Sequence, residues 1–172
     1  SNAGLIIDKD VDLSKIVSKC VMGAFSNQGQ VCISLQRTYV MDELFDEFIN
    51  QFTTLTKQLV IGSPLEEATD ISAMINPSEH DRAMSWVQEA VKHGAEVITG
   101  GITINDVFMP TILTNVSPSS KVSCQEVFAP IVIVNRISSI EEGIAAINDS
   151  NYGLQAGIFT NDIQTAFKAS KK

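Results

Sequence analysis

The sequence predicts an α/β domain of three layers, in which helices cover both faces of a mainly parallel β-sheet. The 172 residues are 44% hydrophobic and 19% charged, which suits one folded domain with a substantial core. Segments with helical spacing of apolar residues alternate with short strand-like runs along the chain. Residues 131–134 form an uninterrupted β-branched run, which is typical of a strand buried on both faces.

The first two helices are predicted from their apolar faces and from the residues at their ends. Apolar residues fall on one face from residue 11 to about residue 26, and Asp12 or Ser14 suits the N-terminal cap. Residues 43–59 carry a longer apolar face, and Gly62-Ser63-Pro64 interrupts the pattern.

The remaining elements follow from the same reasoning. Pro77 suits a first helical turn and Gly94 suits the C′ position after a helix. Helices are expected over residues 77–93 and 138–148 and from 162 to the end, and extended segments over residues 5–7, 37–41, 96–99, 108–116, 131–134 and 155–160.

Charge and composition exclude several classes of partner. The net charge is -8, whereas phosphate binding requires clustered Lys and Arg, so nucleic acid is not an expected partner. No apolar run approaches the ~20 residues of a membrane span, and no signal peptide opens the chain. A membrane partner is therefore not expected.

The cysteines and histidines indicate the compartment and the absence of a metal site. Three cysteines without close pairing argue against disulfides and favour a reducing compartment, most simply the cytoplasm. His80 and His93 lie 13 positions apart with no metal-ligand spacing around them, so no zinc site is expected.

Cys32 is the candidate nucleophile. It lies between a helical pattern and a strand-like run, in the stretch Asn27 to Val40. Nearby helix-terminal N–H groups would lower the pKa of its thiol and stabilise an oxyanion, and Gly29 would allow a close turn. A buried structural cysteine is the commoner fate of a single Cys, and Cys20 on its apolar helix face fits that fate.

A second group of candidate residues lies in the segment from Gln125 to Pro130. Glu126 offers two acceptor oxygens that can bind a diol, and Phe128 offers an aromatic ring close by. The alternative is a solvated glutamate that precedes a strand, with Phe128 in the core.

Together, the two segments resemble the aldehyde dehydrogenase superfamily. Gly29, Gln30, Cys32 and Arg37 match its Gly-Gln-x-Cys pattern with an Arg five residues on. Residues 126–130 resemble its Glu-x-Phe-Gly-Pro segment, although Ala129 replaces the usual Gly. Residues 109–113 and 151–160 resemble scaffold segments of the family, whereas residues 72–75 depart from its usual turn.

The resemblance implies a function and a role for each candidate residue. Cys32 would attack an aldehyde and form first a thiohemiacetal and then a thioester. Glu126 would bind the ribose of NAD or NADP, and Phe128 would lie beside its nicotinamide. Val31 and Ile33 would line the pocket for a small aldehyde substrate. The parent enzyme would be a homodimer or homotetramer.

The resemblance also implies an incomplete enzyme. Residues 4–172 are expected to be part of a catalytic domain of the aldehyde dehydrogenase type, and residues 1–3 are either a tag remnant or native. The general-base Glu, the Asn that completes the oxyanion site, the nucleotide-binding domain and a C-terminal oligomerisation segment would lie outside the chain. The chain alone is then expected to have no turnover.

Two other functions remain open from the residues. Cys32 alone could serve a thiol esterase or hydrolase, and the chain could be a non-catalytic oligomerisation module. A Cys–His dyad is disfavoured, because nothing in the sequence places His80 or His93 near Cys32.

Overall fold

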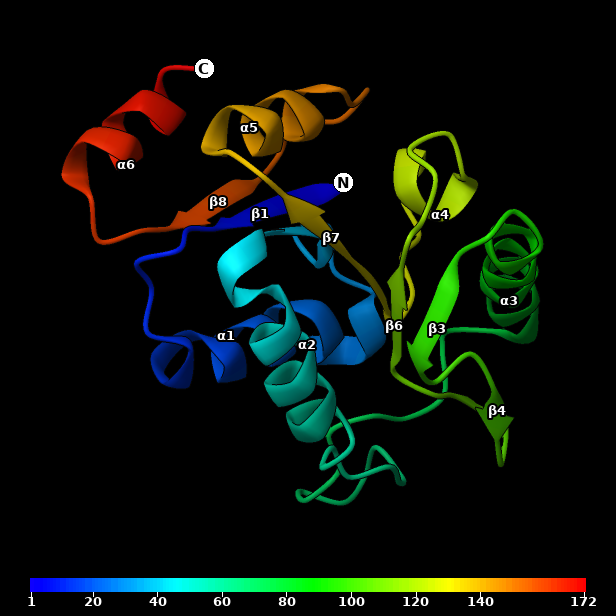
Figure 1. Cartoon of the computed structure of the whole chain (residues 1–172). Helices are drawn as coiled ribbons and strands as arrows, with labels where there is room; N and C mark the ends of the chain where they lie inside the picture. Colours follow the sequence, from blue (N-terminus) through cyan, green and yellow to red (C-terminus); the bar gives the residue numbers. More distant parts are fainter.

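A six-stranded sheet forms the centre of the computed structural model, which describes residues 1–172 (Figure 1). Its strand order is β3-β6-β7-β2-β1-β8, and every neighbouring pair is parallel except the antiparallel β3–β6 pair. The prediction of a mainly parallel sheet is confirmed. The strands are β1 (Ala3–Ile7), β2 (Leu35–Met41), β3 (Glu96–Thr99), β6 (Thr111–Thr114), β7 (Ile131–Ile137) and β8 (Ala156–Phe159).

The helices begin and end within three residues of their predicted bounds. The Asp12 carboxylate caps the first helix by accepting from the Ser14 N–H at 3.1 Å. Pro77 opens the third helix, and Gly94 follows its end with a φ of +100°. The predicted helices are α1 (Leu13–Phe25), α2 (Asp42–Thr56), α3 (Pro77–Lys92), α5 (Ile140–Asn148) and α6 (Ile163–Ser170).

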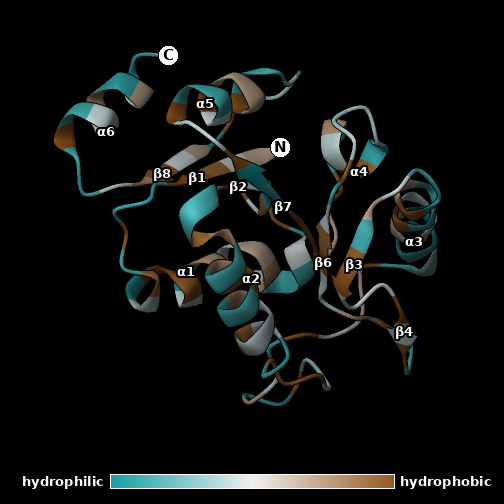
Figure 2. Ribbon diagram, in the orientation of Figure 1, coloured by the Kyte–Doolittle hydropathy of each residue, from teal (hydrophilic) through white to brown (hydrophobic).

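Alternating residues of β7 show how the three layers are assembled. Val132 and Val134 pack in one core cluster with α1 and α2. Ile131 and Ile133 point to the opposite face, where they pack with α3 and the segment before β7. Ile137 lies on this second face and contacts α5. Helices therefore cover both faces, and the apolar strands lie between them in Figure 2, which confirms the three-layer architecture.

The structure also contains short elements that no sequence period could indicate. These are the 3-10 segment η1 (Ser26–Gly29), the hairpin strands β4 (Thr103–Ile104) and β5 (Val107–Phe108), and α4 (Lys121–Cys124). Each spans four residues or fewer, which is too short for an apolar face to be recognised. The segment over residues 108–116 is consequently divided between β5 and β6.

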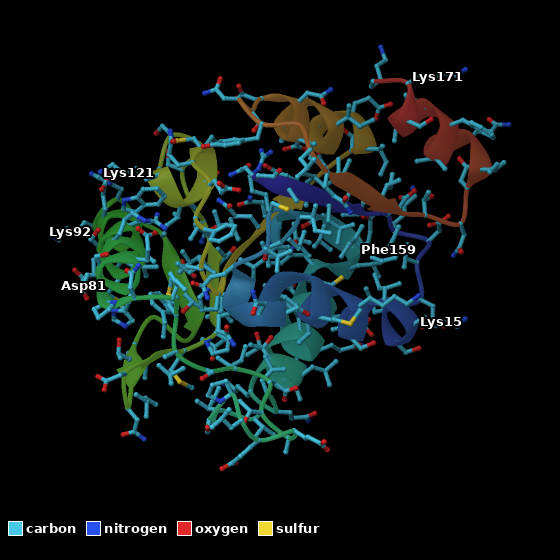
Figure 3. The ribbon with its side chains drawn as sticks, turned by 180° about the vertical axis from the view of Figure 1, so that it is seen from behind. Lys15, Asp81, Lys92, Lys121, Phe159 and Lys171 are labelled. Carbon is cyan, nitrogen blue, oxygen red and sulfur yellow. The ribbon has the colours of Figure 1, made fainter.

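Most charged side chains lie on the outer surface. Lys15, Lys92, Lys121 and Lys171 lie at the margins of the molecule in Figure 3. No helix combines the length and the apolar character that a membrane crossing requires.

Gly29 is the point where the loop after α1 meets the segment that leads into β7. Its φ is +67°, a left-handed conformation that side chains disfavour. A Cβ atom on Gly29 would overlap the carbonyl of Ala129 and crowd the nitrogen of Pro130. The absence of a side chain therefore lets the two backbones touch.

Substitution of Gly29 tests this contact. Gly29→Ala should lower the free energy of unfolding by about 2 kcal/mol or more, because strain and backbone overlap act together. Gly153→Ala is the control, since its Cβ would meet nothing within 4 Å. Urea denaturation measures both variants, and equal stability of the two would contradict the proposed contact.

Candidate active site

Cys32 lies in an exposed turn that leads into β2. The Ser34 N–H donates to the carbonyl of Val31 at 2.9 Å and closes the turn around Cys32 and Ile33. The thiol of Cys32 is exposed, whereas Cys20 on α1 is buried. The geometry thus favours an accessible thiol over a structural cysteine at position 32.

Cys32 is not surrounded by helix-terminal N–H groups, so this part of the prediction is wrong. The turn follows the C-terminal end of η1, and a helix presents free carbonyls rather than N–H groups at that end. The turn offers its own donors instead, because the N–H groups of Val31, Cys32 and Ile33 donate to no atom of the protein.

The residues before the turn adopt an unusual backbone. Asn27, Gln28 and Gly29 have φ values of +51°, +57° and +67° in succession. The side-chain oxygen of Gln30 then accepts from the Ile75 N–H at 2.9 Å. This bond ties the cysteine loop to the segment that precedes α3.

Glu126 and Phe128 both reach the surface. The Glu126 side chain is 35% exposed and Phe128 is 40% exposed, so the alternative that places Phe128 in the core does not hold. Phe128 has a φ of +50°, whereas Ala129 is not among the residues with positive φ. An alanine therefore fits at position 129, because the left-handed residue is its neighbour.

The backbone contact at Gly29 brings the cysteine loop beside the Glu126 segment. A Cβ atom on Gly29 would lie 2.2 Å from the carbonyl oxygen of Ala129, so the loop that precedes Cys32 passes directly against the residues that follow Glu126. The Glu126 carboxylate itself pairs with the nitrogen of Ser1. Cys32 and Glu126 therefore belong to neighbouring segments, although 94 positions separate them in the sequence.

Two polar residues of β2 hold the segments around the candidate site together: Gln36, which no sequence pattern singled out, and Arg37, which was named only as part of the family pattern. The amide of Gln36 bonds to Val122, Gln125 and Val127 around Glu126. The guanidinium of Arg37 is buried and donates to the carbonyls of Asn2, Ala146 and Ile147. The signal in the sequence is a pair of long polar side chains within a strand that is buried along its whole length. Buried polar groups require hydrogen-bond partners, so such a pair indicates specific contacts.

Arg37 has no carboxylate partner in these contacts. Ala146 and Ile147 lie in the last turn of α5, where the helix dipole favours a positive charge. The bond to Asn2 fixes the start of β1, and the side chain of Asn2 in turn donates to the carbonyls of Ser123 and Gln125. Asn2 and Ala3 are therefore integral to the fold, whatever their origin.

Tyr152 also acts on the Glu126 segment. Its hydroxyl accepts from the Glu126 N–H at 3.1 Å. The sequence predicted only a scaffold role for residues 151–160, which include Tyr152, and this hydrogen bond gives that scaffold segment a contact at the candidate site.

The histidines lie elsewhere. His80 of α3 bonds to Asp81 and Thr103 and stacks edge-on against Phe108. His93 caps the end of α3. Neither contacts Cys32, so the structure gives a Cys–His dyad no support. No group of three His, Cys, Asp or Glu side chains is arranged to hold a metal ion.

Residues 1–172 match the aldehyde dehydrogenase family over their full length. The chain is 46% identical to a 3-sulfolactaldehyde dehydrogenase of Priestia aryabhattai over 172 residues, which is 100% of this chain and 36% of that protein. It is 38% identical to a lactaldehyde dehydrogenase of Methanococcus aeolicus over 165 residues, covering 96% of this chain and 35% of that protein.

Solved structures show the same fold. Aldehyde dehydrogenase 21 from Physcomitrella patens, in complex with the reaction product succinate, superposes with a TM-score of 0.96 at 36% identity, over 99% of this chain and 36% of that chain. The NADP-dependent glyceraldehyde-3-phosphate dehydrogenase from Bacillus halodurans, complexed with NADP, superposes with a TM-score of 0.94 at 33% identity. The superposition covers 99% of this chain and 36% of that chain.

The chain belongs to the aldehyde dehydrogenase family. It spans little more than a third of the length of the relatives that it matches.

Thiol labelling tests the difference between the cysteines. Burial raises the pKa of the Cys20 thiol to about 12, and Cys20 is only 2% exposed. Iodoacetamide at pH 8 should therefore alkylate Cys32 at least about a hundredfold faster than Cys20, because only an accessible thiolate reacts. Peptide mass spectrometry measures the rate at which each cysteine is alkylated, and Cys20 should be alkylated only after unfolding in urea. Comparable rates at the two positions in the folded protein would contradict the exposed turn.

Proposed function

We propose that this chain supplies the nucleophile and part of the cofactor site of an NAD(P)-dependent aldehyde dehydrogenase, which oxidises an aldehyde to a carboxylic acid. The observation that carries the proposal is the backbone contact of Gly29 with Ala129, which sets the exposed turn of Cys32 beside the segment of Glu126. An accessible thiol and a partly exposed carboxylate then lie on neighbouring segments, as a shared site for aldehyde and cofactor requires. Family membership favours this function over a cofactor-independent thiol hydrolase and over a non-catalytic module.

Glu126 and Phe128 fit the ribose–nicotinamide half of a dinucleotide. The carboxylate offers two acceptor oxygens for a ribose diol, and the exposed Phe128 ring offers an apolar surface beside it. In a longer chain the Ser1 nitrogen would be a peptide N–H, so the Glu126 carboxylate would no longer pair with a positive charge there. The bound nicotinamide would supply the two-electron acceptor for the oxidation.

Cys32 acts as the nucleophile in this mechanism. Its sulfur attacks the aldehyde carbon to form a thiohemiacetal, and the unbonded N–H of Cys32 donates to the new oxyanion. Oxidation converts this adduct to a thioester, and water then releases the carboxylic acid and the free thiol. The Glu that activates this water and the Asn that completes the oxyanion site belong to segments outside the chain, so the isolated chain lacks turnover.

Val31 and Ile33 precede and follow Cys32 in the exposed turn, and their side chains are proposed to form part of the substrate wall. Ile33 is exposed and Val31 half-buried, so both are available to an aldehyde at Cys32. A small aldehyde substrate is consistent with the sulfolactaldehyde and lactaldehyde named for two relatives. The parent enzyme is proposed to be a homodimer or homotetramer in the cytoplasm, where three free cysteines would stay reduced.

Kinetics of the full-length enzyme test the proposal. Cys32→Ser should reduce NAD(P)H formation at least about a thousandfold, because a hydroxyl is a far weaker nucleophile than a thiolate. Glu126→Gln should raise the KM for NAD(P) about tenfold, because it weakens a charge-assisted bond to the ribose. Cys124→Ser is the control and should leave both parameters unchanged.

The 172-residue chain itself should form no NAD(P)H with a short-chain aldehyde. Full activity of Cys32→Ser, or efficient turnover by the isolated chain, would overturn the proposed mechanism.

A further inference from the structure

Gln36 is a fully bonded amide at the centre of the candidate site. It lies in β2, only four positions after Cys32, and is 4% exposed. Its nitrogen donates to the carbonyls of Val122 at 2.9 Å and Gln125 at 2.7 Å, and its oxygen accepts from the Val127 N–H at 3.1 Å. The bonds to Gln125 and Val127 bracket Glu126 on both sides.

The backbone around Glu126 depends on side chains for its hydrogen bonds. It lies between α4 and β7, where no helix or strand pairs these groups. The Gln125 carbonyl accepts from Gln36 and Asn2, and the Glu126 N–H donates to Tyr152. Among these side chains, only Gln36 bonds to the residues on both sides of Glu126. Buried backbone groups require partners, so the amide determines where this segment lies.

We infer that Gln36 is a positioning residue that sets the place of the Glu126 carboxylate relative to the Cys32 sulfur. This inference rests on the proposed function, in which Glu126 binds the ribose of the cofactor. The amide is anchored in a strand with partners on both sides, β1 and β7, and the cysteine turn leads into the same strand. The strand that directly follows the cysteine turn therefore also fixes the segment proposed to bind the cofactor.

Gln36→Met in the full-length enzyme tests this role. Methionine keeps the length of the side chain and removes all three hydrogen bonds. We expect the KM for NAD(P) to rise about tenfold, and both the KM for the aldehyde and the alkylation rate of Cys32 to change less than about twofold. Thr38→Val is the matched control, because Thr38 is buried in the same strand and its hydroxyl has no partner. This control should leave the cofactor KM unchanged.

A double substitution separates positioning from a general effect on stability. In a Glu126→Gln background, Gln36→Met should raise the cofactor KM by less than about twofold, because its effect acts through the Glu126 carboxylate. An equal increase in both backgrounds would overturn the inference. If Gln36→Met does not fold, Gln36→Glu replaces it, since glutamate keeps the acceptor for Val127 and loses the donated bonds. Its cofactor KM should also rise, and an unchanged value would overturn the inference.

The outcomes distinguish this inference from the proposed function. An unchanged cofactor KM in Glu126→Gln would refute the role of the carboxylate itself, and the inference would fall with it. An increased cofactor KM in Glu126→Gln together with an unchanged value in Gln36→Met would refute only the inference about Gln36.

Discussion

The contact between Gly29 and the backbone at Ala129 and Pro130 is the constraint on which the candidate site depends. Two segments a hundred positions apart (129 − 29) touch there without an intervening side chain, because Gly29 has no Cβ atom. The contact brings the turn of Cys32 beside the segment that carries Glu126. The backbone is left-handed from Asn27 to Gly29, between α1 and β2.

A network of hydrogen bonds from polar side chains of the sheet stabilises the contact between these two segments. Gln36 and Arg37 are buried neighbours in β2 with side chains on opposite faces, as strand geometry requires. Gln36 holds the Glu126 segment, and Arg37 holds Asn2 and the last turn of α5. Burial of a guanidinium without a carboxylate is costly, but the carbonyls at the C-terminal end of α5 offset the charge. The core therefore contributes directly to the geometry of the site.

Much of this architecture is predictable from the sequence, because it depends on local periodicity. The apolar faces of α1, α2 and α3 and the β-branched run at the start of β7 predict their elements and the three layers. The β4–β5 hairpin and α4 are too short to carry such a signal. The contacts of Gln36, Asn2 and Tyr152 depend on partners 26 to 123 positions away, which no local pattern specifies. The convergence of Cys32 and Glu126 was predictable only through resemblance to a family.

The proposed mechanism has Cys32 form a covalent intermediate with the aldehyde while Glu126 helps to hold the cofactor. Acid quenching of the full-length enzyme during turnover, followed by peptide mass spectrometry, detects such an intermediate. We expect an acyl group on the peptide that contains Cys32, present only when both NAD(P) and aldehyde are supplied. Steady turnover with the acyl group on Cys20 or Cys124, or an equal yield of acyl-enzyme without NAD(P), would contradict it.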